Sequence, residues 1–540
     1  MSSGFSIING ESRKGNGETF AAVDPANGVA LDPEFHSASL DDLEFAAGLA
    51  EEASAIYGRS PGSEKARFLM HIAAGLEAIA VELVERARRE TALPEARLKG
   101  ELARTVNQLR LFAQLVAEGS WVNARIDPAL PERKPLARTD IRSMLRPLGP
   151  VAVFGASNFP LAFSVAGGDT ASALAAGDPV IVKAHPAHPG TSELVGQVVS
   201  RSVRECGLPA GVFALLFDAG TEIGSALVAH PAIKAVGFTG SFAGGRELMR
   251  VAAARPEPIP CFMEMSSANP LFVLPGALAT RGAQIAGGLF SSFTLGVGQF
   301  CTKPGLVFLP RNQDADALVN ALKAQVEKSA ASPMLTAGIC RNHTSGVARR
   351  AAHEHVETLA EGAAHAATEG AYAAPALFEV EGQRLLDHPE LAKEIFGPST
   401  LIVRYQGERE MLALARSLEG QLTATVHATE DDLAAHAELI WILERKAGRL
   451  LVNGFPTGVE VCHAMVHGGP WPATSESRMT SVGTQSIFRF ARPVCYQDFP
   501  GSALPDELKD SNPLGIWRLI DGQFTRDGLA AKAPEAVGKA

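Results

Sequence analysis

The chain has 540 residues, of which 46% are hydrophobic and 20% are charged, and 49 Lys and Arg against 59 Asp and Glu give a net charge of −10. This composition excludes a disordered chain, and the length exceeds the roughly 250–300 residues at which a single core stops growing, so we expect at least two packed domains. The acidic balance, without any basic run, excludes the electrostatic footprint of a nucleic-acid-binding protein.

The predicted elements begin with helices and then alternate between strands and helices. Residues 40–120 carry apolar side chains at helical spacing, and 137–148 alternate like an amphipathic strand. Four short apolar runs, each followed by helical sequence, come next at 150–154, 179–183, 212–217 and 233–238. This alternation predicts an α/β fold with a parallel sheet covered on both faces, which binds ligands at the carboxyl ends of its strands.

A second alternating unit begins near Cys261 and continues to about residue 470. Its first elements are a strand, a helix and another strand, at 271–274, 278–294 and 306–309. Beyond this unit, residues 484–498 predict one more strand. The last segment, 500–540, is rich in Pro and Asp and has weak structural signals.

Signals for export or membrane insertion are missing from the sequence. Residues 1–10 lack the basic start and apolar core of a signal peptide. The uncharged stretch 148–168 contains Asn158, Pro160 and four glycines, so a buried strand, turn and helix explain it better than a membrane span. The six cysteines form no CxxC pair, which argues against disulfides and thiolate zinc sites. We expect a reduced, cytoplasmic protein without a membrane partner.

Two residues have the side-chain chemistry of covalent catalysis. Cys301 follows a glycine-containing loop, Gly296-Val297-Gly298-Gln299-Phe300, that lets backbone and substrate approach closely, and a thiolate is a strong nucleophile. The alternative is a small buried hydrophobic residue, as most free cysteines are. Glu264 follows the strand-like 259–263, where a partly desolvated carboxylate can act as a general base. The alternative there is an ordinary solvated glutamate.

Other polar residues lie where predicted strands end. Asn158 directly follows the first parallel strand and can donate an amide N–H to an oxyanion, or serve only as a turn residue. Residues 240–245, Gly-Ser-Phe-Ala-Gly-Gly, join a strand to a helix whose N-terminus can receive a pyrophosphate, although they do not match GxGxxG. Lys183 and Glu394 can contact phosphate or ribose, or can simply be solvated.

The histidines do not form a convincing metal site in the sequence. His185 and His188 are three residues apart, but Pro186 and Pro189 prevent a helix that would present both on one face. His353 and His355 flank Glu354, and no third ligand follows. We therefore predict no bound metal.

Taken in chain order, these signals together resemble the aldehyde dehydrogenase superfamily. They are Asn-Phe-Pro at 158–160, the strand-end Lys183, Phe-Thr-Gly-Ser at 238–241 with a glycine at 245, Glu264, Gly-Gln-Phe-Cys-Thr at 298–302 and Glu-Ile-Phe-Gly-Pro at 394–398. Within the superfamily, 298–305, 467–474 and 512–518 look like the α-ketoglutarate semialdehyde (2,5-dioxopentanoate) dehydrogenase branch. That branch also includes NADP-dependent enzymes for fatty aldehydes.

The resemblance implies an aldehyde-dehydrogenase-like α/β fold. Residues 1–136 and 149–260 would form a Rossmann-type cofactor-binding domain, and 261–470 a catalytic domain. A small β oligomerisation arm would combine 137–148 with 484–498, and such enzymes usually assemble into homodimers or homotetramers.

The resemblance also implies the roles of individual residues. Cys301 would attack the aldehyde carbon, and the Asn158 amide with the Cys301 backbone N–H would hold the oxyanion. After hydride transfer to the nicotinamide, Glu264 would activate the water that hydrolyses the thioester. The implied cofactor-binding residues are Lys183, Gly240, Ser241, Gly245, Glu394 and Phe396.

The chain departs from the common pattern at three places. NAD-using members carry a glutamate three residues after the strand-end lysine, and here that position is Pro186. Because a carboxylate there would repel a 2′-phosphate, its absence favours NADP, with NAD still possible. Ser266-Ser267 replaces a double glycine after the general base. His467-Gly468-Gly469-Pro470 replaces a Pro-Phe-Gly-Gly run, so we expect a different substrate mouth.

The leading hypothesis is therefore NADP-dependent oxidation of α-ketoglutarate semialdehyde to 2-oxoglutarate, and another aliphatic or fatty aldehyde is the alternative. An anionic substrate needs a cation, and the sequence does not choose among Arg281, Lys303 and Arg478. A cysteine hydrolase or acyltransferase would need a histidine base near the thiol, where the sequence supplies Glu264 and a nucleotide-type sheet instead. A catalytically silent binding protein is disfavoured because all three catalytic side chains are retained.

Overall fold

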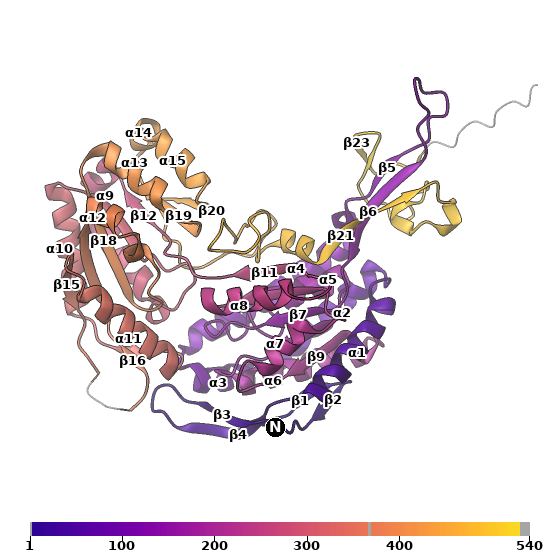
Figure 1. Ribbon diagram of the computed structural model, residues 1–540, viewed down its shortest axis with the longest axis horizontal. Helices are drawn as coiled ribbons and strands as arrows, with labels where there is room; N and C mark the ends of the chain where they lie inside the picture. The colour runs from indigo at the N-terminus through magenta and orange to yellow at the C-terminus, as the bar shows by residue number, and fades with distance from the viewer. Residues whose placement is uncertain (1–2, 366–368, 530–540) are drawn as a thin grey trace, which may run out of the picture.

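The computed structural model describes residues 3–365 and 369–529. Figure 1 shows two α/β lobes side by side and a slender β extension that projects from one of them. Each lobe is built on a seven-stranded sheet, and the extension on a five-stranded sheet. The α/β fold predicted from the alternating strands and helices is confirmed.

The first lobe contains five adjacent parallel strands, which begin at one edge of its sheet. In spatial order the sheet consists of β11 (Cys261–Glu264), β10 (Ala235–Thr239), β7 (Val151–Phe154), β8 (Val180–Lys183), β9 (Phe213–Leu216), β1 (Ser6–Ile8) and β2 (Glu11–Arg13). The strands from β11 to β9 run parallel, whereas β1 and β2 form an antiparallel edge that sequence patterning did not indicate. Strands of three residues are too short to show a period.

Successive residues of the central strands face opposite sides of this sheet, and helices bury both sides. In β7, Val151 and Val153 belong to one apolar cluster, whereas Ala152 and Phe154 belong to another. The first face is covered by α2 (Gly62–Ala78), α3 (Ala80–Thr91), α4 (Glu95–Glu118), α5 (Gly168–Ala176) and α6 (Pro189–Glu205). The second is covered by α1 (Leu40–Tyr57), α7 (Glu222–Ala229) and α8 (Phe242–Ala253).

The second lobe repeats this architecture. In spatial order its sheet consists of β15 (Val356–Glu361), β17 (Ala376–Glu381), β18 (Ser399–Tyr405), β13 (Leu306–Pro310), β12 (Leu271–Val273), β19 (Gln421–His427) and β20 (Ala447–Val452). Only β15 pairs antiparallel within it. One face packs against α9 (Pro275–Thr294) and α10 (Gln313–Glu327), and the other against α12 (Gly382–Asp387), α13 (Gly407–Ser417) and α15 (Ala437–Glu444). Helices α11 (Ala337–Ala351) and α14 (Glu430–Ala435) complete the lobe.

The β extension joins strands from three distant parts of the chain. Its order is β21 (Ala491–Gln497), β6 (Ile141–Pro147), β5 (Arg125–Asp127), β22 (Arg518–Ile520) and β23 (Gln523–Thr525). Residues 484–490, expected to be strand, instead form the 3-10 helix η5, because Ile487 and Phe490 are buried in the first lobe and Arg489 pairs with Asp169 at 2.7 Å. The expectation of a weakly structured tail is also wrong for its described part, since β22 pairs with β5 and β23 pairs with β22; residues 530–540 lie outside the described residues.

Short elements fill the remaining connections. Two small antiparallel pairs are β3 (Thr19–Val23) with β4 (Ala30–His36), and β14 (Ser332–Pro333) with β16 (Tyr372–Ala373). The 3-10 helices are η1 (Ser120–Val122), η2 (Ala210–Val212), η3 (Leu295–Gly298), η4 (Pro389–Ala392), η6 (Gly501–Ala503) and η7 (Asp506–Leu508). In the described part of the chain, no helix combines the length and apolar character that crossing a membrane requires.

Candidate active site

The sequence-predicted site residues meet where the two lobes join. Glu264 is the last residue of β11, the edge strand of the first lobe, and a short antiparallel bridge pairs it with Thr474. A cavity of about 360 Å³ lies beside it. Among the residues that line this cavity are Asn158, Gly240, Ser241, Glu264, Cys301, Glu394 and Phe396. Lys183 and Gly245, the other two predicted cofactor residues, are not part of its wall.

A strained loop presents Cys301 to the cavity. The three residues Gly296, Val297 and Gly298 all have positive φ angles, of 56°, 58° and 64°. At Gly298 only glycine fits, because a Cβ would lie 2.3 Å from the carbonyl carbon of Gly397. Asn269 fixes this loop through its Nδ2, which donates to the carbonyl oxygens of Cys301 at 2.8 Å and Lys303 at 3.0 Å. Sequence reasoning did not identify Asn269.

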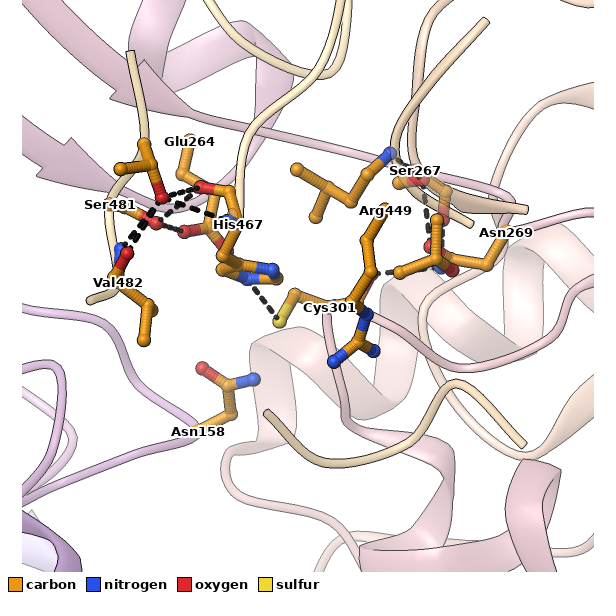
Figure 2. Close-up of polar contacts among 12 residues, drawn as sticks. Asn158, Glu264, Ser267, Asn269, Cys301, Arg449, His467, Ser481 and Val482 are labelled. Carbon is orange, nitrogen blue, oxygen red and sulfur yellow. Dashed lines mark hydrogen bonds and ion pairs between the residues drawn. The ribbon is translucent and has the colours of Figure 1, made fainter. Parts of the chain in front are cut away.

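Cys301 and Glu264 are bridged by a histidine (Figure 2). His467 Nε2 lies 2.8 Å from Glu264 Oε1 and 3.5 Å from Cys301 Sγ. The Ser481 hydroxyl donates to the second oxygen of the Glu264 carboxylate. The long connection between β20 and η5 supplies both His467 and Ser481.

This bridge corrects one expectation from the sequence. A cysteine hydrolase was disfavoured because no histidine was expected near the thiol, but His467 lies there. The imidazole of His467 is fully buried at the thiol, and the expected change in the substrate mouth stays a prediction. The departure from the Pro-Phe-Gly-Gly pattern was the one available signal, and only the fold could place it next to Cys301.

The hydrogen-bond network assigns the proton on His467. Burial raises the pKa of Glu264, but the charge and hydrogen bond of His467, with the hydroxyl of Ser481, outweigh it and hold that pKa below its usual value. An ionised carboxylate can only accept hydrogen bonds, so the proton between Glu264 and His467 belongs to Nε2 of the imidazole. This N–H faces both the carboxylate and the sulfur of Cys301. The buried Nδ1 has no partner among the described residues.

Burial, the Glu264 carboxylate and Glu394 raise the pKa of the Cys301 thiol well above its ordinary value. The resting site therefore holds a thiol next to a carboxylate. Glu264 is positioned to take the proton from the thiol, and the His467 N–H is positioned to stabilise the thiolate that forms.

Asn158 faces this cluster from the first lobe (Figure 2). Its Nδ2 donates to the carbonyl oxygen of Gln299 at 3.0 Å, which orients the amide and leaves its second N–H available. The backbone carbonyl oxygen of Asn158 accepts a hydrogen bond from Arg97 Nη2 at 2.7 Å. The guanidinium of Arg97 stacks between the rings of Phe159 and Phe300, with distances of 5.1 and 4.7 Å to the ring centroids. Arg97, which sequence reasoning missed, therefore joins Asn158 to the residue before Cys301.

The predicted phosphate-binding loop, residues 240–245, lies at the N-terminus of α8. Ser241 caps this helix, its hydroxyl accepting from the N–H of Gly244 at 3.2 Å, and the N–H of Gly240 donates to the carbonyl of Glu264 at 3.0 Å. A Cβ at Gly240 would lie 2.6 Å from the Phe238 ring, so glycine is required there. A helix N-terminus facing a cavity that also reaches the thiol fits the pyrophosphate of a dinucleotide.

Lys183 and Gly245 contribute indirectly. Lys183 is buried at the end of β8, and its Nζ donates to the carbonyls of Asp218 at 3.1 Å and Gly220 at 3.4 Å. Burial lowers the pKa of this amine. Gly245 lets α8 pack closely against Met265, since a Cβ would lie 2.7 Å from its sulfur.

Glu394 lies between two cavities. It borders the 360 Å³ cavity and a neighbouring one of about 280 Å³. Burial raises the pKa of Glu394 to about 7, against the opposing effects of Lys303, Ser266 and Ser267. Ser266-Ser267, which replaces the expected double glycine, thus lies directly at this carboxylate.

Two groups of side chains have the arrangement of metal ligands among the described residues. One is Glu264, Cys301 and His467, and the other His353, His388 and Glu390, with the ligand atoms of each group within 4.8 Å of one another. The premise that no third ligand accompanies His353 is therefore wrong, because the fold brings His388 to it from α12. That the protein binds no metal stays a prediction.

Comparisons with known proteins agree with this geometry. Residues 12–471 match the sequence profile described as "Aldehyde dehydrogenase family". The chain is 53% identical over 521 residues to "Alpha-ketoglutaric semialdehyde dehydrogenase 2" of Azospirillum brasilense, covering 96% of this chain and 99% of that protein. It is 46% identical over 525 residues to "Alpha-ketoglutaric semialdehyde dehydrogenase" of Acinetobacter baylyi, covering 97% and 99%. An NAD-dependent aldehyde dehydrogenase structure from Sinorhizobium meliloti superimposes with a TM-score of 0.78 at 23% identity, covering 93% and 95%, which shows the shared fold.

Proposed function

The chain belongs to the aldehyde dehydrogenase family, and from this premise we propose that it oxidises α-ketoglutarate semialdehyde to 2-oxoglutarate with NADP. As a member of that family it is an NAD(P)-dependent enzyme that converts an aldehyde to a carboxylic acid. The activity in the names of the two curated relatives supports the choice of substrate. The observation that carries the mechanism is the meeting of Cys301, Glu264 and Asn158 at one cavity.

In the first step Glu264 removes the thiol proton of Cys301, and the thiolate attacks the aldehyde carbon. The carbonyl oxygen becomes an oxyanion, which the free N–H of Asn158 and the backbone N–H of Cys301 stabilise, a contribution of about 3 kcal/mol per donor where it is well aimed. A bound nicotinamide supplies the acceptor for the hydride that leaves this carbon. Cys301 then carries a thioester.

The second half of the reaction releases the acid. Glu264 first releases to solvent the proton that it took from the thiol, and then removes a proton from water, whose oxygen attacks the thioester carbon and enters the product carboxylate. The sulfur leaves as thiolate and takes its proton back from Glu264. Throughout, the N–H of His467 holds the Glu264 carboxylate and stabilises negative charge on the sulfur.

The choice of NADP rests on Pro186. Pro186, with His185 and Ala187, lines a cavity of about 440 Å³, and the described residues that line this cavity include no carboxylate. An enzyme without an acidic residue at this position lacks the repulsion that rejects a 2′-phosphate. Assay of the purified enzyme with each cofactor tests this, with a higher kcat/KM expected for NADP and a large preference for NAD contradicting it.

The domain and assembly assignments are part of the same proposal. The proposed cofactor domain (1–136 and 149–260) covers most of the first lobe, and the proposed catalytic domain (261–470) covers the second lobe together with β11, the edge strand of the first sheet. Strands β6 and β21 would form the arm. Both β21 and β20 are edge strands, and an open edge is a surface for pairing with another chain. We expect a cytoplasmic homodimer or homotetramer, which light scattering after size exclusion measures.

A panel of aldehydes tests the function directly. NADPH absorbance is followed with α-ketoglutarate semialdehyde, succinate semialdehyde and straight-chain alkyl aldehydes. We expect the highest kcat/KM for α-ketoglutarate semialdehyde, and a clear preference for long alkyl aldehydes would overturn this substrate in favour of the fatty-aldehyde alternative. A Cys301→Ser variant that reduces NADP at the normal rate would rule out covalent catalysis.

A further inference from the structure

We propose that Arg104 of α4 binds the carboxylate of the substrate, so that the space beside Cys301 is a receptor for oxo acids rather than for neutral aldehydes. The inference rests on the proposed function and adds the cation that an anionic semialdehyde requires. It concerns the class of substrate and does not depend on which semialdehyde is the natural one.

The three cations considered from the sequence already have hydrogen-bond or ion-pair partners within the protein. Arg281 donates to the Ala428 carbonyl at 3.1 Å and to Asn453 Oδ1 at 2.7 Å. Lys303 is fully buried and donates to two carbonyl oxygens, at 3.1 and 2.9 Å. Arg478 is exposed and pairs with its neighbour Glu476. The substrate cation must therefore come from another part of the chain.

Arg104 has the unsatisfied hydrogen-bonding groups that a ligand would fill. Its Nε and Nη2 atoms are buried and have no hydrogen-bond partner among the described residues. Two other arginines near the thiol each leave one buried nitrogen without a partner, Nη1 of Arg97 and Nε of Arg449. Both are nevertheless anchored by backbone carbonyls, Arg97 by Asn158 and Arg449 by Pro456 and Gly458, whereas Arg104 has no such anchor in the described part of the chain. Buried donors without partners are rare in folded proteins, and they often mark a place where a ligand binds.

The acidic residue nearest in sequence does not hydrogen-bond Arg104, although its charge acts on the guanidinium. Glu101 lies one turn earlier on α4, and its Oε1 accepts from the backbone N–H groups of Leu161 and Ala162, at 2.8 and 3.0 Å. Its Oε2 has no hydrogen-bond partner among the described residues, Arg104 included. The buried N–H groups of Arg104 therefore remain available to a bound anion.

Phe163 connects Arg104 to the catalytic residues. The guanidinium lies 4.9 Å from the centroid of the Phe163 ring, and that ring lies 6.4 Å from the imidazole of His467. Phe163 is part of a small apolar cluster with Ala162 and Val482, against which Val459, Val461 and Met465 pack. The positive charge of Arg104 also acts on Cys301, where it opposes the rise in the thiol pKa.

The short chain of the substrate keeps its carboxylate close to the aldehyde carbon that Cys301 attacks. Four C–C bonds separate the aldehyde carbon of α-ketoglutarate semialdehyde from its carboxylate carbon, a span of about 5 Å when extended. The methylene carbons would lie against the apolar cluster, while the carboxylate reaches the two buried N–H groups. A planar guanidinium binds a carboxylate through two parallel hydrogen bonds, which fixes orientation as well as charge. A neutral aldehyde would leave these donors buried and unpaired, so the site selects against it.

The test compares charged and uncharged substrates of equal length in full-length variants. Kinetic constants are measured with 5-oxopentanoate, α-ketoglutarate semialdehyde and pentanal for wild type, Arg104→Met and Arg104→Lys. We expect Arg104→Met to lower kcat/KM for both anions about a hundredfold, mainly through KM, and to change it for pentanal by less than about threefold. Arg104→Lys should be intermediate, because it keeps the charge without the planar pair of donors.

Arg110→Met is the matched control, since Arg110 lies on the same helix and pairs with Glu77 at the surface. It should behave as wild type with every substrate. Binding of 2-oxoglutarate to Cys301→Ala enzyme, measured by calorimetry with and without Arg104→Met, gives a readout that needs no turnover. Equal losses for anions and pentanal in a normally folded Arg104→Met enzyme would overturn the proposal, as would unchanged 2-oxoglutarate binding.

The outcomes also separate this inference from the proposed function. If wild type prefers 5-oxopentanoate to α-ketoglutarate semialdehyde and Arg104→Met abolishes the preference for anions, the role of Arg104 stands and the named substrate fails. If α-ketoglutarate semialdehyde is preferred and Arg104→Met retains the preference for anions over pentanal, the substrate stands and Arg104 fails. A wild-type enzyme that favours pentanal overturns both.

Discussion

The imidazole of His467 is hydrogen-bonded to the carboxylate of Glu264, with 2.8 Å between Nε2 and Oε1, although the two residues are 203 positions apart. Both side chains are almost completely buried. A buried carboxylate alone would be difficult to ionise, and this contact is what keeps Glu264 in its basic form. The general base of the reaction is thus prepared by a residue from the segment that follows the second sheet.

Replacing His467 should therefore alter the pH dependence of the enzyme. The His467→Phe variant loses the strongest effect that opposes the burial of Glu264, and only the weaker effects, such as the Ser481 hydroxyl, remain. The pKa of the carboxyl therefore rises, and the base is ionised only at higher pH. We expect kcat near pH 7 to fall roughly 10- to 100-fold and the acidic limb of the profile to move to higher pH. His463→Phe is the control, because His463 lies in the same segment and contacts only the Thr484 hydroxyl, at 3.2 Å. A lower kcat with an unmoved acidic limb would show that His467 does not act through Glu264.

Arg97 should affect catalysis without touching the substrate. Its guanidinium holds the backbone of Asn158 and stacks on Phe300, next to the nucleophile. Arg97→Leu removes both contacts, so the oxyanion donor and the thiol lose their alignment, and we expect about a tenfold or greater loss in kcat with little change in KM. The rate of Cys301 alkylation by iodoacetamide, which should also change, reports on the loop independently of turnover. Arg445→Leu removes a similar stacked arginine, over Trp441, and should leave both rates unchanged.

Patterns within the sequence were sufficient for the central strands and for the residues that follow them. Apolar runs predicted β7, β8, β9 and β10, and Glu264 was predicted at a strand end, where the structure has it. Residues 484–490 were misassigned because Ile487 and Phe490 face the core from a 3-10 helix, whose spacing in so short a segment resembles an alternating strand. The three-residue strands β22 and β23 carried no periodic signal at all.

The site was only partly predictable for a different reason. Cys301, Glu264 and Asn158 lie in short motifs that can be recognised locally. His467 and Arg104 act through neighbours that are distant in sequence, and each is unremarkable in its own segment: a histidine before two glycines and an arginine on an amphipathic helix. Their importance depends on which buried atoms they meet, or fail to meet, after folding.

The enzyme should not need a metal, although its active site can bind one. The ligand atoms of Glu264, Cys301 and His467 lie within 4.8 Å of one another, and a thiolate, an imidazole and a carboxylate together suit Zn²⁺. We expect dialysis against EDTA to leave activity unchanged, and micromolar Zn²⁺ to inhibit by occupying the nucleophile and the base. In His467→Phe the inhibition constant should rise about tenfold or more, because one ligand is lost. Loss of activity on chelation, restored by added metal, would contradict the prediction that no metal is required.

Glu394 should make the stability of the protein depend on pH. Burial raises its pKa to about 7 in the folded protein, above the ordinary value of 4.5, so the folded state binds more protons than the unfolded state between these values. The free energy of unfolding therefore decreases as pH rises through this window and reaches its lower plateau above about pH 7. The amide in Glu394→Gln cannot ionise, so the free energy of unfolding of this variant does not decrease over the window. We expect its apparent melting temperature to exceed that of wild type by ~2 °C or more at pH 8, and the difference to disappear near pH 4.5. Glu390→Gln, at an exposed carboxylate four residues earlier, is the control and should show no gain at pH 8. A Glu394→Gln protein that is less stable than wild type at pH 8 would mean that the ionised carboxylate is held by Lys303 more strongly than burial opposes it.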